Sequence, residues 1–116
     1  MVKENVVKQK SFDFALRVVK LFKHLQGKKE FILSKQLLRS GTAVGAMVRE
    51  AEFAESKDDF VHKMAIAQKE INETIYWLEL LNAAEYLTTR EFESISPDAT
   101  EILKLITASI KTAKGK

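Results

Sequence analysis

The fold is decided by residues 56–81, SKDDFVHKMAIAQKEINETIYWLELL. The positions expected to face a core advance by alternating steps of four and three, at Phe60, Met64, Ala67, Ile71, Thr74, Leu78 and Leu81. This spacing over three heptads draws one stripe along a helix and is typical of helix bundles. Ser56 followed by two acids is a helix-start pattern, because the serine oxygen accepts from free amides and acids favour the positive helix end. The stretch predicts a helix over about residues 57–85.

Two helices are predicted before this stretch. The first covers about residues 6–25, and Gly27 after it suits a left-handed cap. Its apolar stripe consists of Phe12, Leu16, Val19, Phe22 and Leu25, and Val18 widens it. The second covers about residues 30–54, with its stripe at Ile32, Leu37, Leu38, Val44, Met47, Val48 and Ala51.

A last helix is predicted over about residues 88–114. Thr88 and Glu91 have capping-box spacing, and Pro97 after a serine predicts a kink or a fresh start there. With a single proline and four glycines among 116 residues, few turns are available. We therefore expect a single all-α domain over residues 1–116, an antiparallel up-down-up-down four-helix bundle with its fourth helix kinked or restarted near Pro97.

Composition excludes several classes of protein. No cysteine is present, so disulfides and thiolate metal sites are excluded and a reducing compartment fits. The first ten residues lack the apolar core of a signal peptide, and no apolar run approaches the ~20 residues of a membrane span. We expect a cytoplasmic protein without a membrane partner.

Charge is distributed unevenly along the chain. The net charge is +3, but residues 1–29 carry a balance of +6 and residues 50–85 a balance of −6. Basic segments favour phosphate backbones, and segments of opposite sign also favour contacts between subunits. The candidate nucleic-acid-binding residues are Arg17, Lys20, Lys23, Lys28, Lys35 and Arg39.

Two glycines interrupt the second predicted helix, although each costs about 1 kcal/mol relative to alanine in a helix interior. Gly41 and Gly45 lie one turn apart, and Ser40 and Ala46 keep their surroundings small. We interpret these four residues as a helix-packing groove. It would admit a neighbouring helix or the ring of Phe12, Phe22 or Trp77, with a subunit contact or a ligand as the alternative occupant.

Signatures of enzymes are missing. The glycines lack the Lys-Ser/Thr of a phosphate loop and the spacing of a dinucleotide fold. A carboxylate di-metal site needs two Glu-x-x-His pairs, whereas the nearest match is Asp59 with His62. We expect no catalytic residues, no metal and no cofactor. Three further aromatic residues are expected in the core or at an interface: Phe60, Tyr76 and Trp77.

Two blocks of the sequence resemble a known family. QLLRSGTAVGAMVREA (residues 36–51) and residues 56–81 are similar to the four-helix-bundle proteins encoded in intervening sequences of bacterial 23S ribosomal RNA genes. The detailed matches are Arg39-Ser40-Gly41-Thr42, Gly45, Phe60-x-His62-Lys63 and Tyr76-Trp77-Leu78. Met47 and Arg49 depart from the family, where Asn and Ala or Ser are usual. The two blocks cover about a third of the chain.

The resemblance implies a homo-oligomer, with a pentameric ring as the favoured form. It also implies kinship with the accessory variability protein of diversity-generating retroelements, a basic pentamer of the same fold that engages a reverse transcriptase and nucleic acid. The family has no established enzymatic activity. Fold alone does not carry function, so two hypotheses remain. One is a nonenzymatic protein that binds structured RNA or other nucleic acid through phosphate contacts. The alternative is an oligomeric protein–protein adaptor or scaffold.

Overall fold

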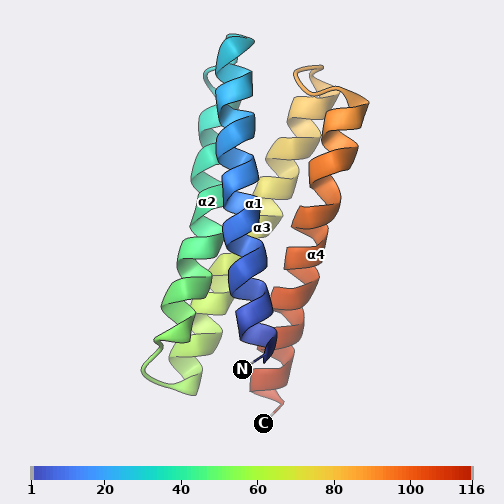
Figure 1. Cartoon of the computed structure of the whole chain (residues 1–116). Helices are drawn as coiled ribbons and strands as arrows, with labels where there is room; N and C mark the ends of the chain where they lie inside the picture. The colour runs from blue at the N-terminus through green and yellow to red at the C-terminus, as the bar shows by residue number, and fades with distance from the viewer. Residues whose placement is uncertain (1, 116) are drawn as a thin grey trace.

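The computed structural model describes the backbone of residues 2–115 and the side chains of residues 6–115. The described chain forms four helices in an elongated bundle of 46 × 21 × 19 Å. They are α1 (Val2–Gly27), α2 (Leu33–Glu52), α3 (Lys57–Ala83) and α4 (Thr89–Lys114). Successive helices run in opposite directions, so both chain ends and the α2–α3 turn lie at one end of the bundle (Figure 1). The antiparallel four-helix bundle is confirmed.

Two predicted helix starts are found where the sequence placed them. The Asp59 amide donates to Ser56 Oγ at 3.0 Å, at the start of α3. At the start of α4 the Glu91 amide donates to Thr88 Oγ1 at 3.1 Å, and the Thr88 amide donates to Glu91 Oε1 at 2.9 Å. Both caps satisfy amides that have no partner within the helix.

α4 continues unbroken through Pro97, so the predicted fresh start does not occur there. Because α4 is continuous, a kink at Pro97 is the only one of the two predicted outcomes that remains. Proline removes one amide from the helix ladder and crowds the carbonyl four residues earlier. Pro97 lies on the exposed side of α4, where water can reach the carbonyl of Glu93 that loses its amide donor.

The turn between α1 and α2 is organised by Glu30, whose side chain is almost completely buried. Its carboxylate accepts from the amides of Ile32, Leu33 and Ser34 at 3.2, 2.9 and 2.6 Å. Burial acts to raise the pKa of Glu30, but the three amides and the Ser34 hydroxyl outweigh it, and the pKa is lowered. The second helix therefore begins at Leu33 and not near residue 30, because Glu30 caps it from outside.

The left-handed residue in this turn is Lys29, with a φ of 64°. The predicted left-handed cap at Gly27 is wrong, because α1 extends two residues beyond its predicted end and includes Gly27 as its last residue. The turn thus comes later than the glycine, and a lysine adopts a conformation that glycine adopts at lower cost.

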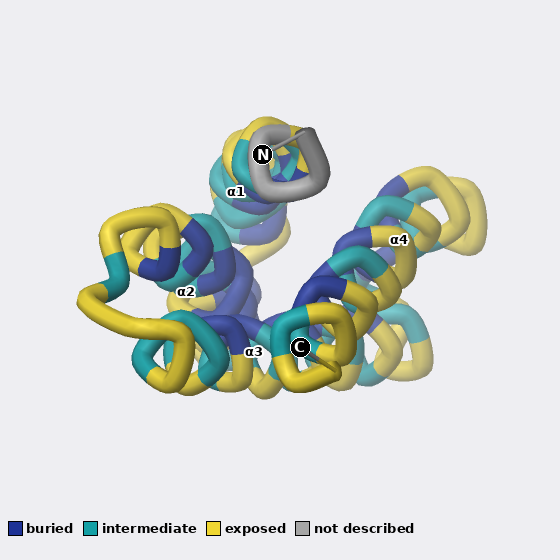
Figure 2. The backbone as a smooth tube through the Cα atoms, turned by 90° about the horizontal axis from the view of Figure 1, so that it is seen from below, coloured by how far each residue is buried: buried dark blue, intermediate teal, exposed yellow. Residues whose placement is uncertain are grey.

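The core runs along the middle of the bundle, where the buried side of each helix faces inward (Figure 2). The stripe predicted for α3 is buried from Met64 to Leu81, with Phe60 partly buried against it. The stripe predicted for α1 is only partly confirmed: Val18 and Leu25 are fully buried, but Phe12 is 49% exposed and Leu16 is 48% exposed. The other buried residues of α1 are Val7, Ser11 and Phe14.

The four residues of the predicted packing groove do not share one surface. Gly41 and Gly45 face α1: a Cβ on Gly41 would lie 2.9 Å from both methyl carbons of Val18, and one on Gly45 would lie 3.3 Å from the Ser11 carbonyl oxygen. Ser40 is directed toward α3, with its Oγ 2.8 Å from Thr74 Oγ1, and Ala46 is exposed. The neighbour that the glycines admit is therefore the backbone and Val18 of α1, and not the ring of Phe12, Phe22 or Trp77.

Candidate nucleic-acid interface

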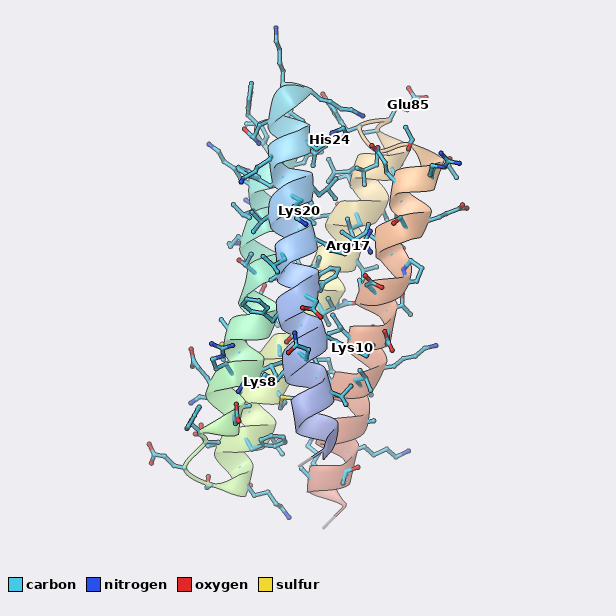
Figure 3. The ribbon with its side chains drawn as sticks, viewed as in Figure 1. Lys8, Lys10, Arg17, Lys20, His24 and Glu85 are labelled. Atoms are coloured by element: carbon cyan, nitrogen blue, oxygen red, sulfur yellow. The ribbon has the colours of Figure 1, made fainter. Side chains whose placement is uncertain are left out.

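A groove of about 470 Å³ runs between α1 and the first turns of α4. From α1 it is lined by Arg17, Lys20, Leu21 and His24, and from α4 by Arg90, Glu91, Ser94 and Ile95. The α1 residues share one side of the helix because they recur at steps of three and four. Leu21 and Ile95 supply apolar surface, and the other lining side chains are polar. Figure 3 shows Arg17 and His24 reaching from α1 toward α4.

Arg17 holds the two walls of the groove together. Its Nη1 donates to the Ser94 carbonyl at 3.0 Å and to Asp98 Oδ2 at 2.7 Å, and its Nη2 donates to Ser94 Oγ at 2.7 Å. Three hydrogen bonds from a planar guanidinium fix its orientation. Arg17 was predicted to bind nucleic acid, but its charge is paired with Asp98 and three of its five N–H donors are engaged within the chain.

Two further contacts join the end of α1 and the residue after it to the start of α4 and to the turn that precedes it. His24 Nε2 lies 3.0 Å from Glu91 Oε2, and Lys28 Nζ donates to the Tyr86 carbonyl at 3.0 Å. The pKa of Glu91 is lowered, chiefly by the hydrogen bond from the Thr88 amide. Burial acts to raise this pKa, and the positive charges nearby lower it further. Lys28 is one of them, since its Nζ lies 3.9 Å from Glu91 Oε1.

Lys20 and Arg90 are the cations of this groove that make no ion pair with any residue from 6 to 115. Both are exposed. A flexible ammonium and a planar guanidinium on opposite walls suit an anion with several oxygens, because each can approach a different oxygen. The groove is therefore able to accept phosphate groups at its mouth.

The six candidate nucleic-acid-binding residues do not form one patch. Only Arg17 and Lys20 line the groove, whereas Lys28 closes its end and Lys23 and Lys35 are exposed outside it. Arg39 lies at the α2–α3 boundary and pairs with Glu70 and Glu73. A prediction from local charge could not foresee these partners, because they come from helices far away in the sequence.

Sequence reasoning missed His24 and Arg90. The spacing of Arg17, Lys20 and His24 does signal a shared polar face, since residues three, four and seven apart are neighbours on a helix. Arg90 gave no such signal, because its place in the groove depends on the packing of α4 against α1.

The three aromatic residues predicted for the core or an interface have different environments. Phe60 and Trp77 are partly buried against the core, while Tyr76 is 54% exposed. The rings of Tyr76 and Trp77 meet edge to face at a centroid distance of 5.0 Å. Trp77 Nε1 donates to Glu73 Oε2 at 3.0 Å, and this hydrogen bond is the main reason that the pKa of Glu73 is lowered.

The described residues offer neither a metal site nor a membrane span. They contain no group of three His, Cys, Asp or Glu side chains placed to hold a metal ion. Among the same residues, every helix is too short or too polar to cross a membrane.

The fold and the groove define a class: an antiparallel four-helix-bundle protein with an open polar groove between its first and last helices. The chain belongs to the family of 23S rRNA-intervening sequence proteins, whose family model matches residues 3–108. This confirms the family to which the glycine-containing block and residues 56–81 pointed.

One solved structure is similar over nearly the whole chain. It is a protein of unknown function from the S23 ribosomal protein family of Bacteroides thetaiotaomicron. The two chains share 57% identity with a TM-score of 0.92, over 94% of this chain and 98% of the other. No curated protein matches this chain.

Proposed function

We propose that this protein is a nonenzymatic, homo-oligomeric bundle that binds structured RNA or other nucleic acid through phosphate contacts at the α1–α4 groove. The observation that carries the proposal is the pair of cations Lys20 and Arg90, which lie on opposite walls of that groove and make no ion pair with any residue from 6 to 115. Arg17 is a positioning residue, because its hydrogen bonds tie α1 to α4 and so set the distance between the two walls of the groove.

Oligomerisation strengthens this proposal. One groove offers two unmatched cations, which is few for a polyanion site. Repeating the groove around a ring multiplies the phosphate contacts, and linked sites raise the apparent affinity without any new contact. A net charge of +3 per chain becomes about +15 in the pentamer that the family resemblance favours.

Neutralising the two groove cations is expected to weaken binding and flatten its salt dependence. In Lys20→Gln/Arg90→Gln, each lost phosphate contact is expected to make the negative slope of log K against log salt shallower by about 0.7–0.9. The matched control is Lys57→Gln/Lys69→Gln, which removes the same charge from exposed positions on α3. Fluorescence anisotropy of a labelled RNA hairpin, between about 50 and 200 mM salt, measures both variants.

The comparison of the two variants decides the proposal. We expect weaker binding and a smaller slope in the groove variant, with a much smaller change in the control. Equal losses in both variants would show that binding follows net charge and does not depend on the groove. Salt-independent binding by the unmodified protein, or no binding at about 50 mM salt, would contradict phosphate recognition altogether.

A protein–protein adaptor is the second candidate function, and the surface around Tyr76 favours it. Tyr76 is exposed, and it lies within the acidic segment of residues 50–85, which repels a phosphate backbone. Arg39, the nearest candidate cation from α2, is already paired with Glu70 and Glu73. An adaptor would retain its protein partner after nuclease treatment, whereas a partner held only through RNA would be released.

A further inference from the structure

We infer that the protein binds unpaired nucleotides, with one base stacked on the ring of Phe12 and the neighbouring phosphates held by Arg49 and Lys20. The inference rests on the nucleic-acid binding of the proposed function. It narrows the ligand to single-stranded segments, such as the loop of a hairpin. It starts from a phenylalanine that the core leaves uncovered.

A hollow of about 420 Å³ lies between the first half of α1 and the last turn of α2. It is lined by Lys8, Gln9 and Phe12 from α1 and by Arg49 from α2. The side chain of Phe12 is 49% exposed. Proteins bind unpaired bases with such a set of groups, because an aromatic ring stacks on the base while cations contact the phosphates.

Arg49 supplies the positive charge that this hollow offers to a ligand. It makes no ion pair with any residue from 6 to 115. Lys8 instead points toward α2 and pairs there with Glu52, Nζ to Oε1 at 3.0 Å (Figure 3). Asp13, the next acid along α1, accepts from Gln9 Nε2 at 2.9 Å and lines a different hollow on the α4 side. The hollow therefore suits an anion joined to a flat ring, which is the chemistry of a nucleotide.

The hollow is joined to the α1–α4 groove by a row of side chains on the outer face of α1. Phe12, Leu16 and Lys20 recur at steps of four and are all exposed. The row begins where Phe12 lines the hollow with Arg49 and ends where Lys20 lines the groove with Arg90. Its two ends are about 12 Å apart along the helix axis. Stacked nucleotides rise about 3.4 Å each, so about four of them reach from one site to the other.

This arrangement favours a single strand over a duplex and over a protein. Bases of an uninterrupted duplex are already stacked, whereas those of a loop or a strand end are able to turn out onto an aromatic ring. A protein partner would have to place an apolar group on Phe12 and an acid on Arg49. The acids of α2 do not neutralise Arg49, since Glu52 is paired with Lys8 and Glu50 projects about 100° away around the helix. One strand of nucleotides satisfies both the hollow and the groove.

Removing the ring of Phe12 tests the stacking. Phe12→Ala is expected to weaken binding of a labelled single-stranded RNA of about 12 nucleotides by about 5- to 100-fold, the range for one base stacked on one aromatic side chain. Binding of a blunt duplex made from the same strand and its complement is expected to be unchanged, because the phosphate contacts remain. Phe12→Tyr keeps a ring and is expected to keep the affinity. Tyr76→Ala, which removes an exposed ring from α3, is the matched control. Fluorescence anisotropy at one salt concentration measures all of these.

Several results would overturn the inference. Single-strand binding that survives Phe12→Ala would show that no base stacks on the ring, and equal losses for single strand and duplex would show that the ring acts on the fold or on the phosphate contacts. Light scattering on Phe12→Ala is expected to give the mass of the unmodified protein. A smaller mass would show that a second copy covers Phe12. Loss of a nuclease-resistant protein partner, with RNA affinity kept, would assign the ring to a protein contact.

Failure of this inference is distinguishable from failure of the proposed function. If the unmodified protein binds neither the single strand nor the duplex, nucleic-acid binding is wrong and the stacking site is wrong with it. If Lys20→Gln/Arg90→Gln weakens binding of both RNAs while Phe12→Ala weakens neither, the groove stands and the stacking is wrong. If only Phe12→Ala weakens single-strand binding, the stacking stands and the groove is wrong.

Discussion

Gly41→Leu is expected to lower the free energy of unfolding by about 3 kcal/mol, at the upper end of what overfilling a core costs. Even a Cβ at this position would lie 2.9 Å from both Val18 methyl carbons. Val18 is fully buried and β-branched, so its side chain has no other rotamer to adopt freely. The larger side chain has to push α1 away from α2. Urea unfolding followed by circular dichroism, at one fixed protein concentration, measures the loss.

Gly27→Ala is the matched control for steric crowding. A Cβ on Gly27 meets nothing within 4 Å, and its φ is not positive, so alanine is expected to stabilise the end of α1 by about 0.5 kcal/mol or more. Gly41→Ala is expected to destabilise, and adding Val18→Ala should remove part of that loss, because the two positions are in contact. If Gly41→Leu unfolded at the same urea concentration as the unmodified protein, the close approach of α1 and α2 would not govern stability.

Glu30→Gln is expected to cost about 2 kcal/mol at neutral pH, since hydrogen bonds to a charged group are worth about 1.5–3 kcal/mol. The carboxylate accepts from three amides at the start of α2 and lies at the positive end of that helix. A glutamine keeps the shape but turns an NH₂ group toward amides that need an acceptor. Glu79→Gln, a change at an exposed carboxylate on α3, is expected to alter stability by no more than about 0.5 kcal/mol.

The pH dependence separates charge from shape. The folded pKa of Glu30 is lowered from the ordinary value of 4.5, so its stabilisation is fully present above that value and is lost as the pH falls through the folded pKa. The difference between the unmodified protein and Glu30→Gln should therefore shrink below about pH 4.5. A difference that stayed constant from pH 7 to pH 3 would assign the whole effect to shape.

The sequence predicted the buried stripe of α3 because its apolar positions keep the alternating four-three spacing without a break from Phe60 to Leu81. The seven positions from Phe60 to Leu81 draw a single heptad stripe, and all but Phe60 are fully buried. α1 has two solutions: one stripe through Phe12 and Leu16, and another through Ser11, Phe14 and Val18. Hydrophobicity favours the first, but the close approach of α2 at Gly45 requires a small residue, and Ser11 provides it. This choice is made by tertiary packing, which local periodicity does not contain.

The candidate site was harder to predict, because the sequence does not show which acid pairs with a given basic residue in the folded chain. Arg17 and Arg39 look alike as basic residues on predicted helices, yet both are engaged by acids more than 30 positions away. Arg17 and His24, on either side of Lys20, pair with Asp98 and Glu91 of α4, whereas Lys20 makes no ion pair with any residue from 6 to 115. The turn at Lys29 is similar: its left-handed backbone follows from where α1 ends, and a lysine gives no local sign of it.

The seam between α1 and α4 is crossed by the polar contacts of Arg17, His24 and Lys28, whereas α1 and α2 meet through close packing at two glycines. Dissolved ions screen contacts between exposed charges and barely affect apolar packing. Raising the ionic strength is therefore expected to weaken the ion pairs that tie α1 to α4, and likewise those of Arg39 between α2 and α3, while the close packing of α1 on α2 at the two glycines stays nearly unchanged. If phosphates bind at Lys20 as proposed, the salt that competes with them would also loosen the ion pairs of the surrounding walls, so we expect the width of the groove and its affinity for a polyanion to change together.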